Sequence, residues 1–228
     1  MRNTLLLLGC AAAFVWSFAA SSAFGQTWDV TSQFSSTVNP NGAWSYGWEA
    51  PTTAGASDSL PVAGSFTLDV SQAPTLPQWI ANASQFPDVW LNNTGSTEHS
   101  VAPGQVSLHP DNSGDASVVR WTSPVSGEVS ISSQFFPGDS GIMDVWVLDN
   151  GVQLYNNIDS GTFNQDENVS IGDVIDFAVD MGPNGYTSGN TPLAVTITVV
   201  PEPASLAMLC LAGAGLTVRP RRAIIATA

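Results

Sequence analysis

Apolar and polar residues alternate with a period of two in several short segments of the middle of the chain. Ile175, Phe177 and Val179 alternate with polar or small residues, and the same pattern recurs at 129–132 and 195–199. A period of two places the apolar side chains on one face of a pleated strand. The pattern therefore predicts short β-strands that each bury one face.

Glycine, proline and asparagine interrupt these segments at short intervals. Asp149-Asn150-Gly151 separates the apolar segments 143–148 and 152–155 and predicts a tight hairpin, because Asn and Gly tolerate a positive φ. Only residues 76–86 have a pattern compatible with a helical turn. Many short strands with such turns and no repeat period predict one all-β domain, an antiparallel β-sandwich over residues 26–199.

The N-terminal region has the order of elements of a secretory signal peptide. An apolar stretch at 5–20 follows a basic start and precedes small residues at Ala23 and Gly25. This order predicts export and removal of residues 1–25. A lipoprotein would need Cys10 as its modified residue, and the residues around Cys10 match such a signal poorly.

A second apolar segment lies close to the C-terminus, at 204–218. Pro201 and Pro203 precede it and end the last strand, since proline has no backbone N–H to donate. The segment is shorter than the roughly 20 residues that span a bilayer, and the arginines after it would stay in the cytoplasm. A buried terminal helix is the alternative, but a core helix would have a polar face and would not end in a basic cluster.

The order of these C-terminal elements is specific: Pro201-Glu202-Pro203, the apolar segment, and then Arg219, Arg221 and Arg222. In this order, residues 200–222 resemble the PEP-CTERM sorting signal of Gram-negative and planctomycete-like bacteria. The resemblance implies that residues 200–228 are a sorting and anchor segment, held transiently in the inner membrane as a short transmembrane helix. It also implies an exosortase-type protease as partner, and delivery to the cell surface or an extracellular matrix.

The region between the two ends is strongly acidic. Residues 26–200 contain 18 of the 19 acidic residues and one basic residue, Arg120, so 18 negative charges less one positive charge leave −17. Phosphate binding needs basic groups, so this balance excludes a nucleic-acid partner and disfavours acidic polysaccharides. We expect Arg120 to pair with a carboxylate and to stack on an aromatic ring, with a ligand-binding role as the alternative.

Cysteine chemistry is absent from the same region. Cys10 and Cys210 both lie in the removable ends. The mature domain therefore has no disulfide, no thiol nucleophile and no cysteine-bound metal, and its core alone has to hold it together.

A second resemblance covers most of residues 33–198. The stretches 39–48 (NPNGAWSYGW), 106–132 and 169–193 resemble a module of secreted planctomycete and cyanobacterial proteins that opens with NPNG-x-WSYG. The resemblance implies a jelly-roll-like sandwich akin to carbohydrate-binding modules. It brings no catalytic residues with it.

The sequence contains no recognisable catalytic motif. The glutamates are scattered, the G-x-S-x-G elbow is absent, and the only histidines are His99 and His109. His109 lies at a predicted strand end, where a hydrogen-bonded turn residue is the simpler interpretation than a base or ligand. We therefore predict that the protein is not an enzyme.

A calcium site is one interpretation of the loop that contains Asp111, Ser113 and Asp115. These residues place oxygen ligands at alternate positions of a glycine-containing loop, as a hard cation requires. The other interpretation is a solvated Asx turn. Apart from this structural calcium, we expect no cofactor.

Trp44, Tyr46 and Trp48 occupy alternate positions, so an extended strand would place the three rings on one face. Two interpretations remain open. The rings form the inner face of the first long strand, since aromatic residues dominate cores, or they form a carbohydrate-binding platform, with Ser45 and Gly47 on the other face.

Together these features favour an exported, non-catalytic surface or extracellular-matrix module that binds neutral glycans. A purely structural or adhesive matrix component without a small ligand is the alternative. A glycoside hydrolase is a more distant one, because 18 acidic residues can always supply a pair of carboxylates on paper.

Overall fold

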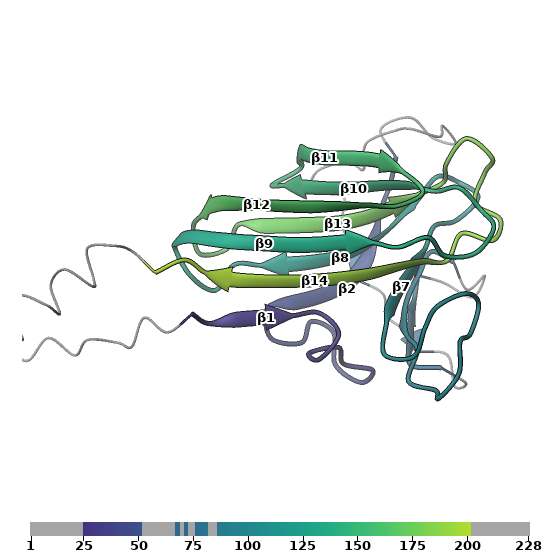
Figure 1. Ribbon diagram of the computed structural model, residues 1–228, viewed down its shortest axis with the longest axis horizontal. Helices are drawn as coiled ribbons and strands as arrows, with labels where there is room; N and C mark the ends of the chain where they lie inside the picture. Colours follow the sequence, from purple (N-terminus) through teal and green to yellow (C-terminus); the bar gives the residue numbers. More distant parts are fainter. Residues whose placement is uncertain (1–24, 52–66, 69–70, 73–75, 82–85, 202–228) are drawn as a thin grey trace, which may run out of the picture.

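The computed structural model describes residues 25–51, 67–68, 71–72, 76–81 and 86–201. These residues form two antiparallel β-sheets that pack face to face, and no helix occurs among them (Figure 1). The predicted all-β class and antiparallel sandwich are therefore confirmed. The predicted signal peptide, apart from Gly25, and the sorting segment beyond Pro201 lie outside the described residues.

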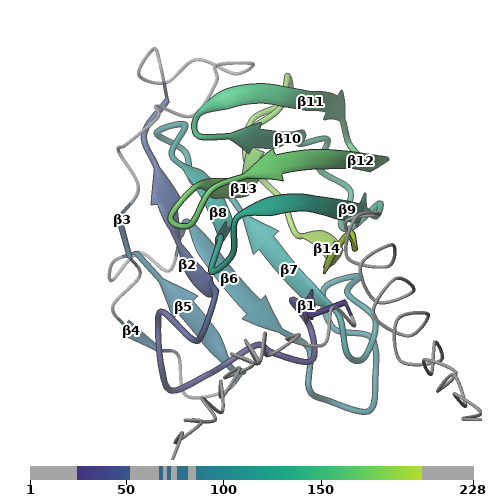
Figure 2. The same cartoon turned by 90° about the vertical axis from the view of Figure 1, so that its left-hand side faces the viewer.

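The larger sheet has eight strands, in the order β12-β9-β14-β7-β6-β5-β4, with β1 paired to β14. Their bounds are β1 Thr27–Asp29, β4 Ser71–Gln72, β5 Gln78–Ile80, β6 Asp88–Leu91, β7 Val106–His109, β9 Gly127–Phe135, β12 Gly161–Val169 and β14 Thr191–Val199. Strand β14 pairs with β7 at its start, over residues 191–193, and with β9 from there to its end, over residues 193–199. Figure 2 shows the twist of this sheet, in which β6 and β7 run at an angle to β9 and β12.

The smaller sheet has six strands, in the order β11-β10-β13-β8-β2-β3. Their bounds are β2 Trp44–Glu49, β3 Thr67–Leu68, β8 Ala116–Thr122, β10 Asp144–Asp149, β11 Val152–Ile158 and β13 Val174–Asp180. From β7 to β10, and again from β11 to β14, every connection takes the chain from one sheet to the other. The strands β9 and β14, and likewise β8 and β13, therefore become neighbours although they are distant in the sequence.

The core lies between the two sheets and contains the apolar residues of the alternating pattern. Its largest fully buried side chains include Trp44, Tyr46, Trp121, Phe135 and Phe177. Burial of apolar surface is the main favourable term in folding. The alternation in the sequence thus predicts correctly which face of β9 and β14 is buried. It also predicts which face of β13 meets the core, although the second face of β13 is buried as well.

The predicted helical turn within residues 76–86 is wrong for the described part of that segment. Gln78–Ile80 forms strand β5, which pairs with β6. Trp79 is buried in the core, and its indole N–H donates a hydrogen bond to the Ser35 carbonyl oxygen at 2.8 Å. Insertion of this ring between the sheets favours extended backbone over the local helical preference.

Both ends of the described chain lie at one end of the sandwich. Thr27 is the register partner of Thr198, and the Val199 amide donates to the Gln26 carbonyl oxygen at 3.0 Å. Figure 1 shows the start of β1 beside the end of β14. The loops that join β9 to β10 and β13 to β14 lie at the opposite end. No helix of the described residues could span a membrane.

The hairpin predicted from Asp149-Asn150-Gly151 is confirmed, since it joins β10 to β11 with φ values of 48° at Asn150 and 77° at Gly151. Asn150 also anchors the turn to β13, the neighbour of β10 in the sheet, because its side-chain oxygen accepts a hydrogen bond from the Val174 amide at 3.1 Å. The turn therefore needs left-handed backbone at two consecutive residues.

We expect Gly151→Ala to lower the free energy of unfolding by about 1–2 kcal/mol, because a Cβ is unfavourable in left-handed backbone. Urea unfolding of the full-length protein measures this loss. Gly95→Ala is the matched control, since a Cβ added there would meet no atom within 4 Å and the φ of Gly95 is not left-handed. Equal stability of the two variants would contradict the prediction.

Candidate functional site

The aromatic row of β2 is part of the core. Trp44 and Tyr46 are 1% and 0% exposed, and both belong to the cluster between the sheets. The Trp44 indole N–H donates to Gln33 Oε1 at 2.9 Å, and the Tyr46 ring packs on Phe34 with centroids 4.7 Å apart. The carbohydrate-binding platform is therefore wrong for Trp44 and Tyr46. Trp48 is partly buried, and one ring does not form a row.

The acidic loop brings the three predicted calcium ligands together. Asp111 Oδ1 accepts hydrogen bonds from the backbone amides of Ser113, at 2.7 Å, and Asp115, at 3.1 Å. The Ser113 hydroxyl lies 2.7 Å from both Asp111 carboxyl oxygens and 3.2 Å from Asp115 Oδ2. Burial, and then the nearby Asp111 charge, raise the pKa of Asp115.

These contacts form an Asx turn that is closed by its own hydrogen bonds. Within the described part of the chain, no group of three or more His, Cys, Asp or Glu side chains is arranged to hold a metal ion. Calcium binding by Asp111, Ser113 and Asp115 stays a prediction. A lower melting temperature in chelator would support it, since an ion that binds only the native state stabilises that state.

Arg120 joins three central strands of the smaller sheet on its outer face. Its guanidinium donates to both carboxylate oxygens of Asp176 on β13, at 2.6 and 2.7 Å, and to Glu49 Oε1 on β2, at 2.5 Å. The side chains of both acids are 2% exposed. The predicted pairing of Arg120 with a carboxylate is confirmed, and its bidentate geometry is the strong form of such a contact.

One guanidinium faces two carboxyl groups, so the charges of this cluster do not balance unless a proton remains bound. The pKa of Glu49 is raised to about 8, first by burial and then by the neighbouring Asp176, while Arg120 opposes both effects. Glu49 therefore holds a proton at neutral pH, while Asp176 takes the bidentate contact. The cluster joins β2, β8 and β13, and its two carboxyl groups are 2% exposed, so it is poorly placed for acid–base catalysis.

The outer face of the smaller sheet is also buried over its central strands β8, β10 and β13. Trp146 is 5% exposed and Leu148 is 1% exposed, and both belong to a second apolar cluster, which contains Ala116, Val118, Trp146, Leu148 and Ala178. This face is not an open surface in the structure.

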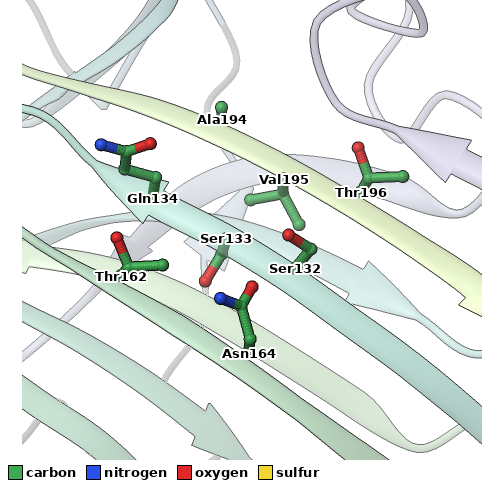
Figure 3. A pocket seen from close by; sticks show the side chains of 8 residues that line it. All are labelled: Ser132, Ser133, Gln134, Thr162, Asn164, Ala194, Val195 and Thr196. Carbon is green, nitrogen blue, oxygen red and sulfur yellow. The ribbon is translucent and has the colours of Figure 1, made fainter.

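The outer face of the larger sheet is open and polar over β9, β12 and β14. A shallow depression of about 170 Å³ lies over β9, β12 and β14 (Figure 3). The side chains around it carry no charge: Ser132, Ser133, Gln134, Thr162, Asn164, Ala194, Val195 and Thr196. Ser133 and Val195 are buried beneath its floor.

Strand register arranges the outward side chains of this face in rows across the three strands. Gln134 is the partner of Thr162 on one side and of Ala194 on the other. Ser132 is likewise flanked by Asn164 and Thr196. Four of these side chains make no hydrogen bond to any other described residue: Ser132, Gln134, Thr162 and Asn164. Their donors and acceptors are free to bind a ligand.

This face escapes prediction from sequence because uncharged polar residues at alternate positions look like the ordinary solvent side of a strand. Its only signal is the density of Ser, Thr, Asn and Gln on strands that become neighbours in the fold. That density is invisible before the register of β12, β9 and β14 is known.

The two histidines lie where the sequence suggested. His99 is exposed in a loop, and its ring meets Trp90 edge-on at 6.2 Å. His109 is the last residue of β7 and is buried, with a hydrogen bond from its ring to the Pro110 carbonyl oxygen at 2.7 Å. The predicted place of His109 at a strand end and its hydrogen bonding are confirmed, although it belongs to the strand and not to a turn.

Residues 199–222 match the PEP-CTERM protein-sorting motif. This confirms the sorting signal recognised in the sequence, and the motif implies an exported, surface-associated protein. No curated protein matches the chain.

Several solved structures show local similarity. A family 35 carbohydrate-binding module from Clostridium thermocellum is 12% identical, with a TM-score of 0.30 over 42% of this chain and 78% of that module. A CBM4 module is 12% identical, with a TM-score of 0.25 over 48% and 80% of the two chains. Rabbit GITRL is 15% identical, with a TM-score of 0.29 over 38% and 75%. Similarities at this level carry no information on the ligand.

Burial of the β2 rings predicts a large effect of Trp44→Ala. Removing a buried tryptophan side chain should lower the free energy of unfolding by about 3–5 kcal/mol, from lost transfer energy and the cavity left behind. Chemical unfolding measures this loss, and Trp48→Ala, at a partly buried position, should cost clearly less. A Trp44→Ala protein as stable as the wild type would contradict the placement of this ring.

Glu49 gives the stability of the protein a distinct pH dependence. Its folded-state pKa lies above its ordinary value of 4.5, so the native state binds this proton more tightly than the unfolded state does. The resulting stabilisation is complete below pH 4.5 and is lost as the pH rises towards 8, by at most about 1.4 kcal/mol per pH unit.

Glu49→Gln mimics the protonated acid, so this variant should lose less stability than the wild type between pH 5 and pH 8. Melting curves across this range provide the measurement. Glu128→Gln, at an exposed position, should retain the wild-type pH dependence. Parallel curves for Glu49→Gln and the wild type would show that Glu49 holds no extra proton.

Proposed function

We propose that the protein is an exported, non-catalytic surface or matrix module that binds a neutral glycan on the outer face of its larger sheet. The observation that carries this proposal is the set of free, uncharged side chains around the depression over β9, β12 and β14. The rigid strands fix the positions of these groups before any ligand arrives, which lowers the entropy cost of binding.

The chemistry of this face suits sugar hydroxyls. The Gln134 and Asn164 amides each offer a carbonyl acceptor and an NH₂ donor, and the Ser132 and Thr162 hydroxyls can do either. A sugar hydroxyl also donates and accepts, so it can be satisfied in several orientations. The domain charge of −17 repels anionic chains and leaves neutral glycans as the favoured class.

The sorting motif supports the cellular part of the proposal. We expect an exosortase-type protease to process residues 200–228 after transient anchoring in the inner membrane, and the mature domain to reach the cell surface or matrix. The alternation of the chain between the sheets is in keeping with a jelly-roll-like sandwich. Catalysis is not part of the proposal, because the close pair Glu49 and Asp176 is buried and bound to Arg120.

A purely structural or adhesive matrix component is the second candidate. It is favoured by the lack of an aromatic ring among the residues that line the depression, since stacking on rings is a common source of affinity for flat ligands. On this alternative, the polar face is the ordinary solvated side of an antiparallel sheet.

The double variant Gln134→Ala/Asn164→Ala tests the site. We expect it to weaken binding to neutral polysaccharides by tenfold or more, a loss of about 1.4 kcal/mol, because two amides each lose their hydrogen bonds to the ligand. Affinity electrophoresis over a panel of neutral polysaccharides, followed by calorimetry on those that bind, measures the change.

The control variant Gln153→Ala/Asn93→Ala removes the same two amide groups at exposed positions elsewhere and should bind as the wild type does. If the wild type binds and both variants bind equally well, the site is wrong. A wild-type protein that binds none of the polysaccharides would favour the matrix component.

A further inference from the structure

His109 connects the end of β7 to the loop between β13 and β14, residues 181–190, through both nitrogens of its ring. Nδ1 lies 2.7 Å from the Pro110 carbonyl oxygen, and the Gly189 backbone amide donates to Nε2 at 3.1 Å. The two partners come from segments that are 79 residues apart, Pro110 and Gly189.

These two bonds fix the protonation state of the ring. A carbonyl oxygen can only accept, so Nδ1 must carry the hydrogen, and a backbone amide can only donate, so Nε2 must be bare. Only the neutral Nδ1–H tautomer satisfies both partners. A second proton on Nε2 would place two N–H groups opposite each other at the Gly189 amide.

The loop held by His109 in turn holds the loop between β9 and β10. The Gly141 amide donates to the Ser188 carbonyl oxygen at 2.9 Å, and the Asp139 amide donates to the Asn190 carbonyl oxygen at 3.1 Å. The Asn190 side-chain amide also donates to Asp139 Oδ2 at 2.8 Å. The hydrogen bond between His109 and Gly189 therefore helps to hold both the β13–β14 loop and the β9–β10 loop, at the end of the sandwich opposite β1.

The surroundings of His109 leave little room for an alternative arrangement. The ring is 4% exposed, stacks on Phe86 with centroids 4.1 Å apart and meets Tyr186 edge-on at 6.2 Å. At Gly189, even a Cβ would lie 2.6 Å from the Tyr186 carbonyl oxygen. The loop at Gly189 is therefore tightly packed, and a small shift would not give the Gly189 amide a new acceptor in place of His109.

We propose that His109 is a pH-sensitive latch, whose protonation in mildly acidic surroundings breaks its bond to Gly189 and releases residues 181–190 from the end of β7. This goes beyond the proposed glycan binding, since the latch lies outside the depression and would operate with or without a ligand.

The other titratable groups around the ring modulate the latch but do not reverse it. Asp139 on the β9–β10 loop favours the charged ring, and His99 on the β6–β7 loop opposes it. Asp88 lies directly across from His109 in the register of β6 and β7, and the Tyr186 ring meets the His109 ring edge-on. Burial is the largest effect, and it lowers the pKa of His109 below its ordinary 6.5.

The sign of the pH dependence follows from this shift. Above pH 6.5 the ring is neutral whether the latch is closed or open, so the closed state keeps its full stability. Below that pH the open state binds the proton more tightly, so each further pH unit favours opening by up to about tenfold, until the closed state is protonated as well.

Hydrogen exchange of the full-length protein at pH 7.5 and pH 5 tests the latch, with rates corrected for intrinsic pH dependence. We expect the protection of the Gly189 amide to fall by tenfold or more at pH 5 in the wild type and in His99→Gln. In His109→Gln, which does not titrate, protection should not change with pH. Constant protection in the wild type, or the same fall in His109→Gln, would overturn the proposal.

A spectroscopic measurement keeps the test independent of how well the variant folds. Nitrogen-15 NMR of the histidine side chains of the wild type should show the Nδ1–H tautomer for His109 at neutral pH. Its titration should coincide with a shift of the Gly189 amide signal. An Nε2–H tautomer, or a titration that leaves the Gly189 signal unmoved, would rule the latch out.

Discussion

Packing of the two sheets across an aromatic core is the interaction on which the rest of this structure depends. The region between the processing segments has no cysteine, so no disulfide supports the sandwich. Trp28 and Trp121 meet edge-on with centroids 5.2 Å apart, and Trp44 and Tyr46 fill the neighbouring space. Edge-to-face pairs of this kind add about 0.5–1.5 kcal/mol beyond the burial of their area. The cost of this arrangement is that the rings of β2 are not available to a ligand.

Functional chemistry is therefore left to the outer faces and the loops. The outer face of the smaller sheet is buried over its central strands, and Arg120 on this face is paired with Glu49 and Asp176. The outer face of the larger sheet is open, polar and uncharged around its depression. The loops opposite β1 are joined through His109 and Gly189, so this end can respond to pH while the sheets stay intact. The proposed binding site and the proposed pH response thus occupy separate parts of one scaffold.

The predictions from sequence succeed where a local pattern has a single structural solution. Alternation in β13 and β14, and the Asn150-Gly151 turn, each specify one conformation, and the structure shows it. At β2 they leave two interpretations open, and the structure bears out the core for Trp44 and Tyr46. Alternation alone does not decide between them, because Ser45 and Glu49 on the second face are buried as well. The sequence also does not identify the partners of Arg120, because any of 18 acidic residues is a candidate. Only the strand order β2-β8-β13 shows which of them lie beside Arg120.

Backbone amide shifts measured by NMR can locate the neutral glycan that we propose lies on the outer face of β12, β9 and β14. The full-length protein would be titrated with an oligosaccharide of a neutral polysaccharide that it retains. We expect shifts concentrated at 132–134, 162–164 and 194–196, the segments that line the depression. Shifts confined to β2, β8 and β13 of the smaller sheet would contradict it.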